Sequence, residues 1–116
     1  MPQTMRVYWG RIRGRTPLNF NWGIIDRNSI VIITASEWRV NPLGQEPDDG
    51  DYQRFVGDAT IRVANISPHG PPTDPNRGVT FVVEVDYDEA LPVVTDITVL
   101  DGRPGEIVHM ENASDL

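Results

Sequence analysis

The sequence contains no cysteine and no lysine among its 116 residues. Without cysteine, neither a disulfide bond nor a zinc site built from thiolates can stabilise the fold. Only two histidines are present, and we find no nucleophile elbow, no His-Glu-x-x-His motif and no phosphate-binding glycine loop. We therefore expect a protein that is not an enzyme and that needs no cofactor.

Long apolar runs are also missing. The longest, Ile30–Ile33, is far too short to span a bilayer, and no apolar stretch typical of a secretory signal follows Met1. We therefore expect no membrane partner, and the sequence leaves the cellular compartment open.

The formal net charge of -7 is unevenly distributed. Residues 1–15 contain four arginines and no acidic residue, whereas residues 16–116 contain six arginines and all seventeen acidic residues. We do not expect nucleic acid as a partner, because the acidic residues would repel phosphate from most of the surface.

Ten prolines and ten glycines punctuate segments in which apolar residues recur with period two. This pattern is typical of an all-β fold. We predict a single antiparallel β-sandwich of six or seven strands with long Pro/Gly-rich loops. It forms one domain over residues 1–116, and residues 111–116 are a frayed tail. The expected strands are Met5–Ile12, Asn28–Trp38, Arg54–Ile66, Gly78–Asp88 and Leu91–Leu100, with short strands at Trp22–Ile25 and Glu106–Met110.

Both faces of the segment Asn28–Trp38 are apolar, which predicts a central strand covered on both sides. For the acidic residues of Gly78–Asp88 we favour a solvated sheet face. The alternative is an ion pair of Glu84 with Arg62, which requires that Arg54–Ile66 and Gly78–Asp88 form a hairpin. Between the strands lie the three long connections 13–27, 39–53 and 67–77.

Within the connection 39–53, Asp48, Asp49 and Asp51 cluster beside Gly50. Calcium takes oxygen ligands of this kind, although turns are rich in Asp and Gly for reasons of backbone conformation alone. These three residues are the candidate calcium ligands.

Arg11, Arg13 and Arg15 project from one face if the chain stays extended, and a guanidinium binds carboxylate or phosphate through two parallel hydrogen bonds. We expect them to contact acidic groups. Among the tryptophans, Trp9 and Trp38 are assigned to the core, and Trp22 is the expected exposed residue for stacking on a sugar.

If the strands alternate in direction and Trp22–Ile25 is not a true strand, the connections 13–27 and 67–77 meet at one end of the domain. That end then carries His69 and Arg77 with Arg13 and Arg15, and the other end is acidic. These six residues are the candidate binding residues: Arg11, Arg13, Arg15, Trp22, His69 and Arg77. The leading hypothesis is a module that binds protein, including itself, through an arginine-rich end and an acidic end. The alternative is a carbohydrate- or small-ligand-binding module, assisted by calcium.

Overall fold

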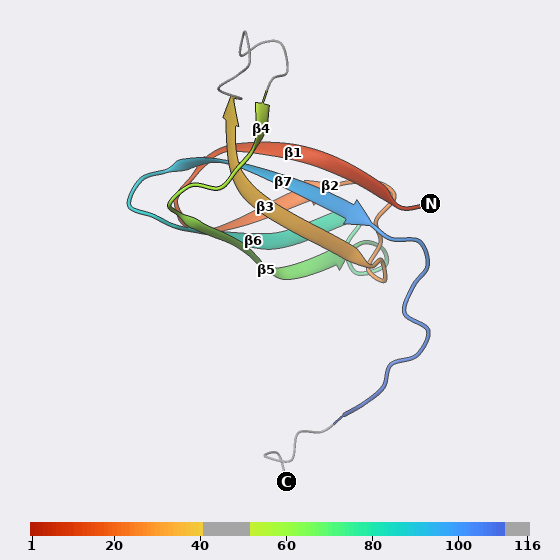
Figure 1. The fold of residues 1–116 in the computed structure, drawn as a ribbon. Helices are drawn as coiled ribbons and strands as arrows, with labels where there is room; N and C mark the ends of the chain where they lie inside the picture. Colours follow the sequence, from red (N-terminus) through yellow and green to blue (C-terminus); the bar gives the residue numbers. More distant parts are fainter. Residues whose placement is uncertain (41–51, 111–116) are drawn as a thin grey trace.

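The computed structural model describes residues 1–40 and 52–110. These residues contain strands and no helix (Figure 1). Among them there is thus no helix that could cross a membrane. The strands are β1 (Gln3–Ile12), β2 (Gly14–Asn21), β3 (Val31–Val40), β4 (Tyr52–Phe55), β5 (Thr60–His69), β6 (Gly78–Asp86) and β7 (Leu91–Val99).

The strands form two antiparallel sheets. Sheet A has the order β1-β7-β3-β4, and sheet B has the order β2-β6-β5. The predicted all-β sandwich of six or seven strands is confirmed, with one refinement, because sheet A curves into a half-barrel over sheet B (Figure 1).

The core lies between the two sheets and is built mainly from the central strands β6 and β7. Alternate residues of β6 point inward, and Phe81 and Val83 are fully buried. Val93 and Ile97 of β7 are equally buried on the facing sheet, as the period-two pattern predicts for inward positions. Val82 and Val94, on the opposite faces of these two strands, are also buried. Trp9 packs edge-to-face on Phe81, which confirms its place beside the core.

The connection predicted over residues 13–27 is wrong, because its first half is strand β2. Leu18 and Phe20 alternate with exposed residues and pack against the core. Pro17, which argued for a loop, is compatible with β2 because this strand lies at the edge of its sheet. The short strand expected at Trp22–Ile25 is instead a turn that buries Ile25 completely.

Two further expectations are corrected. The outer face of β3 is not covered, since Ile32 is 49% exposed there. The residues 106–110 do not form the predicted strand, and they extend away from both sheets (Figure 1).

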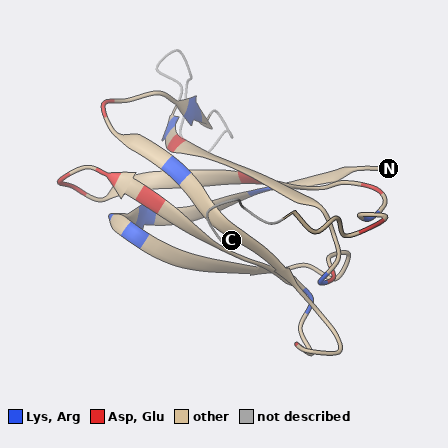
Figure 2. Cartoon of the chain, turned by 90° about the horizontal axis from the view of Figure 1, so that it is seen from below, with Lys and Arg blue, Asp and Glu red and all other residues tan. Residues whose placement is uncertain are grey.

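The extra strand β2 also changes which loops meet. Ile12 pairs with Leu91, so the β1–β2 turn lies at the same end as the turn between β6 and β7. Arg13 therefore shares this end with Asp88 and Glu89, and not with Arg77. Both signs of charge occur at both ends of the domain (Figure 2), so the predicted separation into a basic and an acidic end is wrong.

Candidate functional site

Aromatic and arginine side chains gather on the outer face of sheet A, the side turned away from sheet B. We call this surface the arginine–aromatic face. In the register of the sheet, Arg6 lies opposite Asp96, Asp96 opposite Thr34, and Trp38 opposite Arg54. Its members are Arg6 and Tyr8 of β1, Thr34, Ser36 and Trp38 of β3, Tyr52 and Arg54 of β4, and Asp96 of β7.

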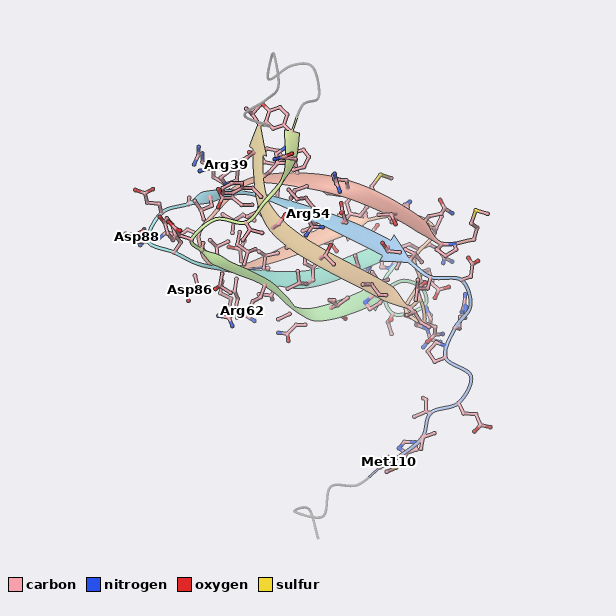
Figure 3. All side chains as sticks on the ribbon, viewed as in Figure 1. Arg39, Arg54, Arg62, Asp86, Asp88 and Met110 are labelled. Atoms are coloured by element: carbon pink, nitrogen blue, oxygen red, sulfur yellow. The ribbon has the colours of Figure 1, made fainter. Side chains whose placement is uncertain are left out.

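Asp96 is the polar centre of this face. Arg6 donates to both of its carboxylate oxygens, with Nε–Oδ1 and Nη2–Oδ2 distances of 2.7 and 2.9 Å. Arg54 Nη1 donates to Oδ2 at 3.0 Å (Figure 3). The hydrogen bond from Arg6 lowers the pKa of Asp96, and Arg54 adds to this effect, whereas partial burial opposes it. The same hydrogen bond raises the pKa of Arg6.

Arg54 also donates to two hydroxyl groups of β3. Its Nε donates to Ser36 Oγ at 2.8 Å, and Nη1 donates to Thr34 Oγ1 at 2.7 Å. Arg54 is thus held by three partners, and Arg6 by two parallel hydrogen bonds to Asp96, so both guanidinium groups are positioned before any ligand arrives.

The aromatic side chains continue the same surface. Trp38 and Tyr52 stack with nearly parallel rings whose centroids are 5.7 Å apart. The Arg6 guanidinium lies 5.6 Å from the centroid of Trp38, within the range of a cation–π contact. Tyr8, on the edge strand β1 of the same sheet, is 53% exposed. Trp38 thus belongs to the surface and not, as predicted, to the core.

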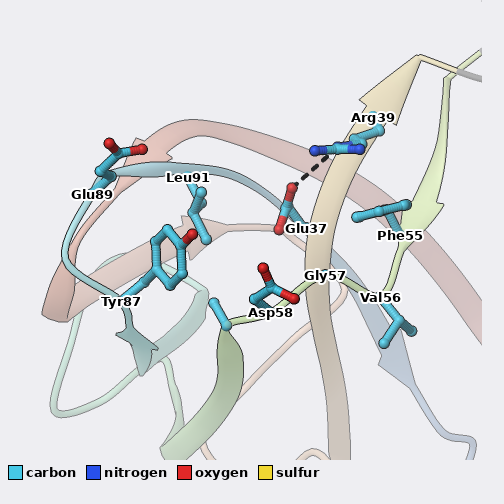
Figure 4. A pocket seen from close by; sticks show the side chains of 10 residues that line it. Glu37, Arg39, Phe55, Val56, Gly57, Asp58, Tyr87, Glu89 and Leu91 are labelled. Atoms are coloured by element: carbon cyan, nitrogen blue, oxygen red, sulfur yellow. Dashed lines mark ion pairs between the residues drawn. The ribbon is translucent and has the colours of Figure 1, made fainter.

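A cleft opens at the end of the sandwich near the turn between β6 and β7 (Figure 4). This cleft of about 350 Å³ is lined by Glu37, Asp58, Tyr87 and Glu89 among others. The Glu37 side chain is only 8% exposed, and Arg39 compensates its charge with an Nε–Oε2 distance of 3.4 Å. Since this pair accounts for the buried carboxylate, we treat the cleft as structural.

The three arginines predicted to share one face diverge. Arg11 donates to the carbonyl of Ala90 from sheet A, whereas Arg15 lies opposite Glu84 on sheet B. The chain passes from one sheet to the other between them, and Gly14 has a positive φ of 69° there. Because β5 and β6 are neighbours, Arg62 does pair with Glu84, with an Nε–Oε2 distance of 3.1 Å.

Trp22, His69 and Arg77 do lie together, at the end formed by the connections 22–30 and 70–77. The amide of Trp22 donates to the carbonyl of Arg77, and the Trp22 ring packs edge-to-face on Phe20. Trp22 is half-buried against the core and is not the exposed platform that we expected.

His69 is likewise held in place. Its Nε2 lies 2.6 Å from Asn19 Oδ1, and its Nδ1 lies 2.8 Å from the carbonyl oxygen of Asn76. Both partners are oxygen acceptors, so a neutral ring donates to one of them and only a protonated ring donates to both. In either form the bond connects segments at this end of the domain, which gives His69 a structural role. The candidate calcium ligands Asp48, Asp49 and Asp51 lie outside the described residues. Within the described residues, no group of three or more His, Asp or Glu side chains is arranged to hold a metal ion.

Comparison of the chain with protein-family models, with curated proteins and with solved structures finds no match. A function for this chain is therefore argued from the geometry of its own residues.

Proposed function

We propose that the chain is a non-enzymatic binding module that assembles with protein through the arginine–aromatic face, and that a second copy of the chain is one such partner. The observation that carries the proposal is the concentration of Trp38, Tyr52 and Tyr8 with two arginines on one exposed face of a sheet. Tryptophan, tyrosine and arginine are the residue types that contribute most to binding energy at protein interfaces.

The fixed geometry of the face supports the same conclusion. Binding costs less entropy when the contacting side chains are already ordered. Arg6 and Arg54 are ordered by Asp96, and Tyr52 by its stack on Trp38. Two arginines share one carboxylate, so the face keeps a positive charge in a chain of net charge -7. An acidic surface on another copy is electrostatically complementary to it.

Sedimentation equilibrium over a range of protein concentrations tests self-association. We expect an average mass above that of the monomer at low salt, and a smaller excess at high salt because the charges are screened. Tyr52→Ser should weaken association by about tenfold or more, in line with the loss of an aromatic anchor.

Tyr87→Ser is the matched control. Tyr87 is 38% exposed and Tyr52 39%, but Tyr87 lies at the turn after β6 and outside the arginine–aromatic face. We expect it to associate like the unsubstituted chain. A strictly monomeric chain at high concentration in low salt contradicts self-assembly, and equal effects of the two substitutions contradict the assignment of the face.

The second candidate function is carbohydrate binding at the same face. The stacked rings of Trp38 and Tyr52 favour it, because exposed aromatic faces can pack on the apolar face of a sugar ring. Binding to a glycan array that disappears with Tyr52→Ser, in a chain that remains monomeric, would favour this candidate over protein assembly.

A further inference from the structure

The segment that follows β7 leaves the domain with its apolar side chains uncovered. Arg103 forms an ion pair with Asp26, and beyond it the chain extends away from the sheets (Figures 1 and 3). Ile107, Val108 and Met110 are 82%, 73% and 86% exposed. Scattered apolar residues are normal on a surface, but three within a four-residue stretch, exposed among the residues that the structure describes, form an apolar segment that a partner can cover.

The composition of residues 106–110 favours a β-strand, since isoleucine and valine are strong strand formers. An isolated strand is not stable in water, because its backbone groups find no partner and its side chains find no core. This segment therefore needs the free edge of an existing sheet.

The edges of the two sheets differ in how well they accept a strand. The edge strands β2 and β5 contain Pro17 and Pro68, and β5 also has an irregularity between Ala64 and Ser67. Strand β4 has only four residues. Proline, bulges and short length all hinder the addition of a further strand.

Strand β1 is the most accessible edge. Within the described residues it pairs with β7 alone, and Gln3–Tyr8 is an unbroken stretch without proline. Met5 and Tyr8 on this stretch are 40% and 53% exposed. The edge of β1 therefore offers both free backbone groups and apolar side chains to an added strand.

The charges of the two segments are complementary. β1 contains Arg6 and Arg11 and no acidic residue, whereas residues 106–110 contain Glu106 and no arginine. We infer that residues 106–110 of one copy add as a strand to the free edge of β1 in a second copy. This inference rests on the proposed function and names the segments that join the copies.

Such an interface joins two different surfaces, so each copy can donate its segment to the next one and accept another. A contact of this type builds rings or open chains and not only dimers. Because β1 also carries Arg6 and Tyr8, the added strand runs beside the arginine–aromatic face.

Substitutions at Val108 and Met5 test the inference in the full chain. Val108→Pro removes an amide donor and hinders strand pairing, while Val108→Thr keeps a β-branched residue and serves as its control. Met5→Lys places a charge on the accepting edge. Sedimentation equilibrium measures association, and hydrogen–deuterium exchange measures amide protection in residues 3–12 and 106–110.

In the unsubstituted chain we expect exchange in both segments to slow by about tenfold or more as association increases with concentration. Val108→Pro and Met5→Lys should abolish this protection and weaken association by about tenfold or more, whereas Val108→Thr should retain both. Near-UV circular dichroism verifies that each variant keeps the packing of its domain.

Three results would overturn the inference. If Val108→Pro associates as strongly as Val108→Thr, the segment does not join the copies, although the proposed self-assembly stands. If residues 106–110 are protected equally at all concentrations, the segment folds back on its own chain. If the unsubstituted chain is monomeric and these residues are unprotected, the inference and the proposed self-assembly fail together.

Discussion

Asp96 holds the arginine–aromatic face together, and the substitution Asp96→Asn measures how strongly. The carboxylate accepts two hydrogen bonds from Arg6, at 2.7 and 2.9 Å, and one from Arg54 at 3.0 Å. Asparagine has nearly the same size, but it removes the negative charge and directs an NH₂ donor at groups that can only donate. The substitution therefore tests electrostatics and hydrogen bonding without creating a cavity.

The expected loss follows from the exposure of the two pairs. The Arg6 side chain is 51% exposed. Solvent therefore screens its ion pair with Asp96, and the pair should contribute only about 0.5–1 kcal/mol to the free energy of unfolding. Arg54 is 31% exposed and is held by further hydrogen bonds, so its bond to Asp96 should contribute about 1 kcal/mol. We expect Asp96→Asn to lower the free energy of unfolding near pH 7 by about 1.5–2 kcal/mol, and Tm by roughly 5–10 °C.

The pH dependence provides an independent check. Because the hydrogen bond from Arg6 lowers the pKa of Asp96 in the folded state, its stabilisation is complete above the pKa of the unfolded chain, about 3.9. That stabilisation is lost as the pH falls through the lower folded pKa. The difference in stability between the unsubstituted chain and Asp96→Asn should therefore shrink as the pH is lowered below about 4.

Urea unfolding over a series of pH values measures both quantities. Asp86→Asn is the control, because Asp86 is exposed on β6 and makes no ion pair with any described residue. We expect it to change the stability by less than about 0.5 kcal/mol. A loss for Asp96→Asn no larger than that of the control, or one that is constant from neutral to acidic pH, would refute this account of Asp96.

Two further predictions concern residues outside this face. In Gly57→Ala the new Cβ would lie 2.7 Å from Glu37 Oε1, so urea unfolding should show a free energy of unfolding lower by about 1–3 kcal/mol. Gly105→Ala is the control and should be nearly neutral, because no atom lies within 4 Å of the new Cβ. His69→Ala removes a ring that lies between two oxygen acceptors and should lower stability by about 1–2 kcal/mol in calorimetry, whereas the exposed Asn28→Ala should leave Tm unchanged. Equal effects within either pair would contradict the packing described here.

The alternation of apolar residues predicted the fold class and the inward faces of β6 and β7, because buried strands impose period two on the sequence. The position of β2 was not predicted. Its alternating residues are interrupted by Pro17, which signals a loop unless the strand is known to lie at a sheet edge. Edge position is a property of the assembled sheet and is not encoded in the local pattern. The error then moved Arg13 to the wrong end of the domain.

The candidate site was harder to predict than the fold. Arg6 and Asp96 are 90 positions apart in the chain, and their contact depends on the pairing of β1 with β7. Trp38 was assigned to the core because large aromatic residues are usually buried, and β3 has apolar residues on both faces. The pair of Arg62 with Glu84 was predictable, since these residues lie on strands that follow one another directly in the chain.

The exclusive use of arginine as the basic residue has a structural consequence at Asp96. A planar guanidinium reaches both oxygens of one carboxylate at once, as Arg6 does, while its central carbon lies over the ring of Trp38. A lysine ammonium at this position would be a single point of charge and could not serve both neighbours in this way. The polar centre and the aromatic stack are thus joined through one side chain. For this reason we expect the arginine–aromatic face to bind its partner as one rigid surface.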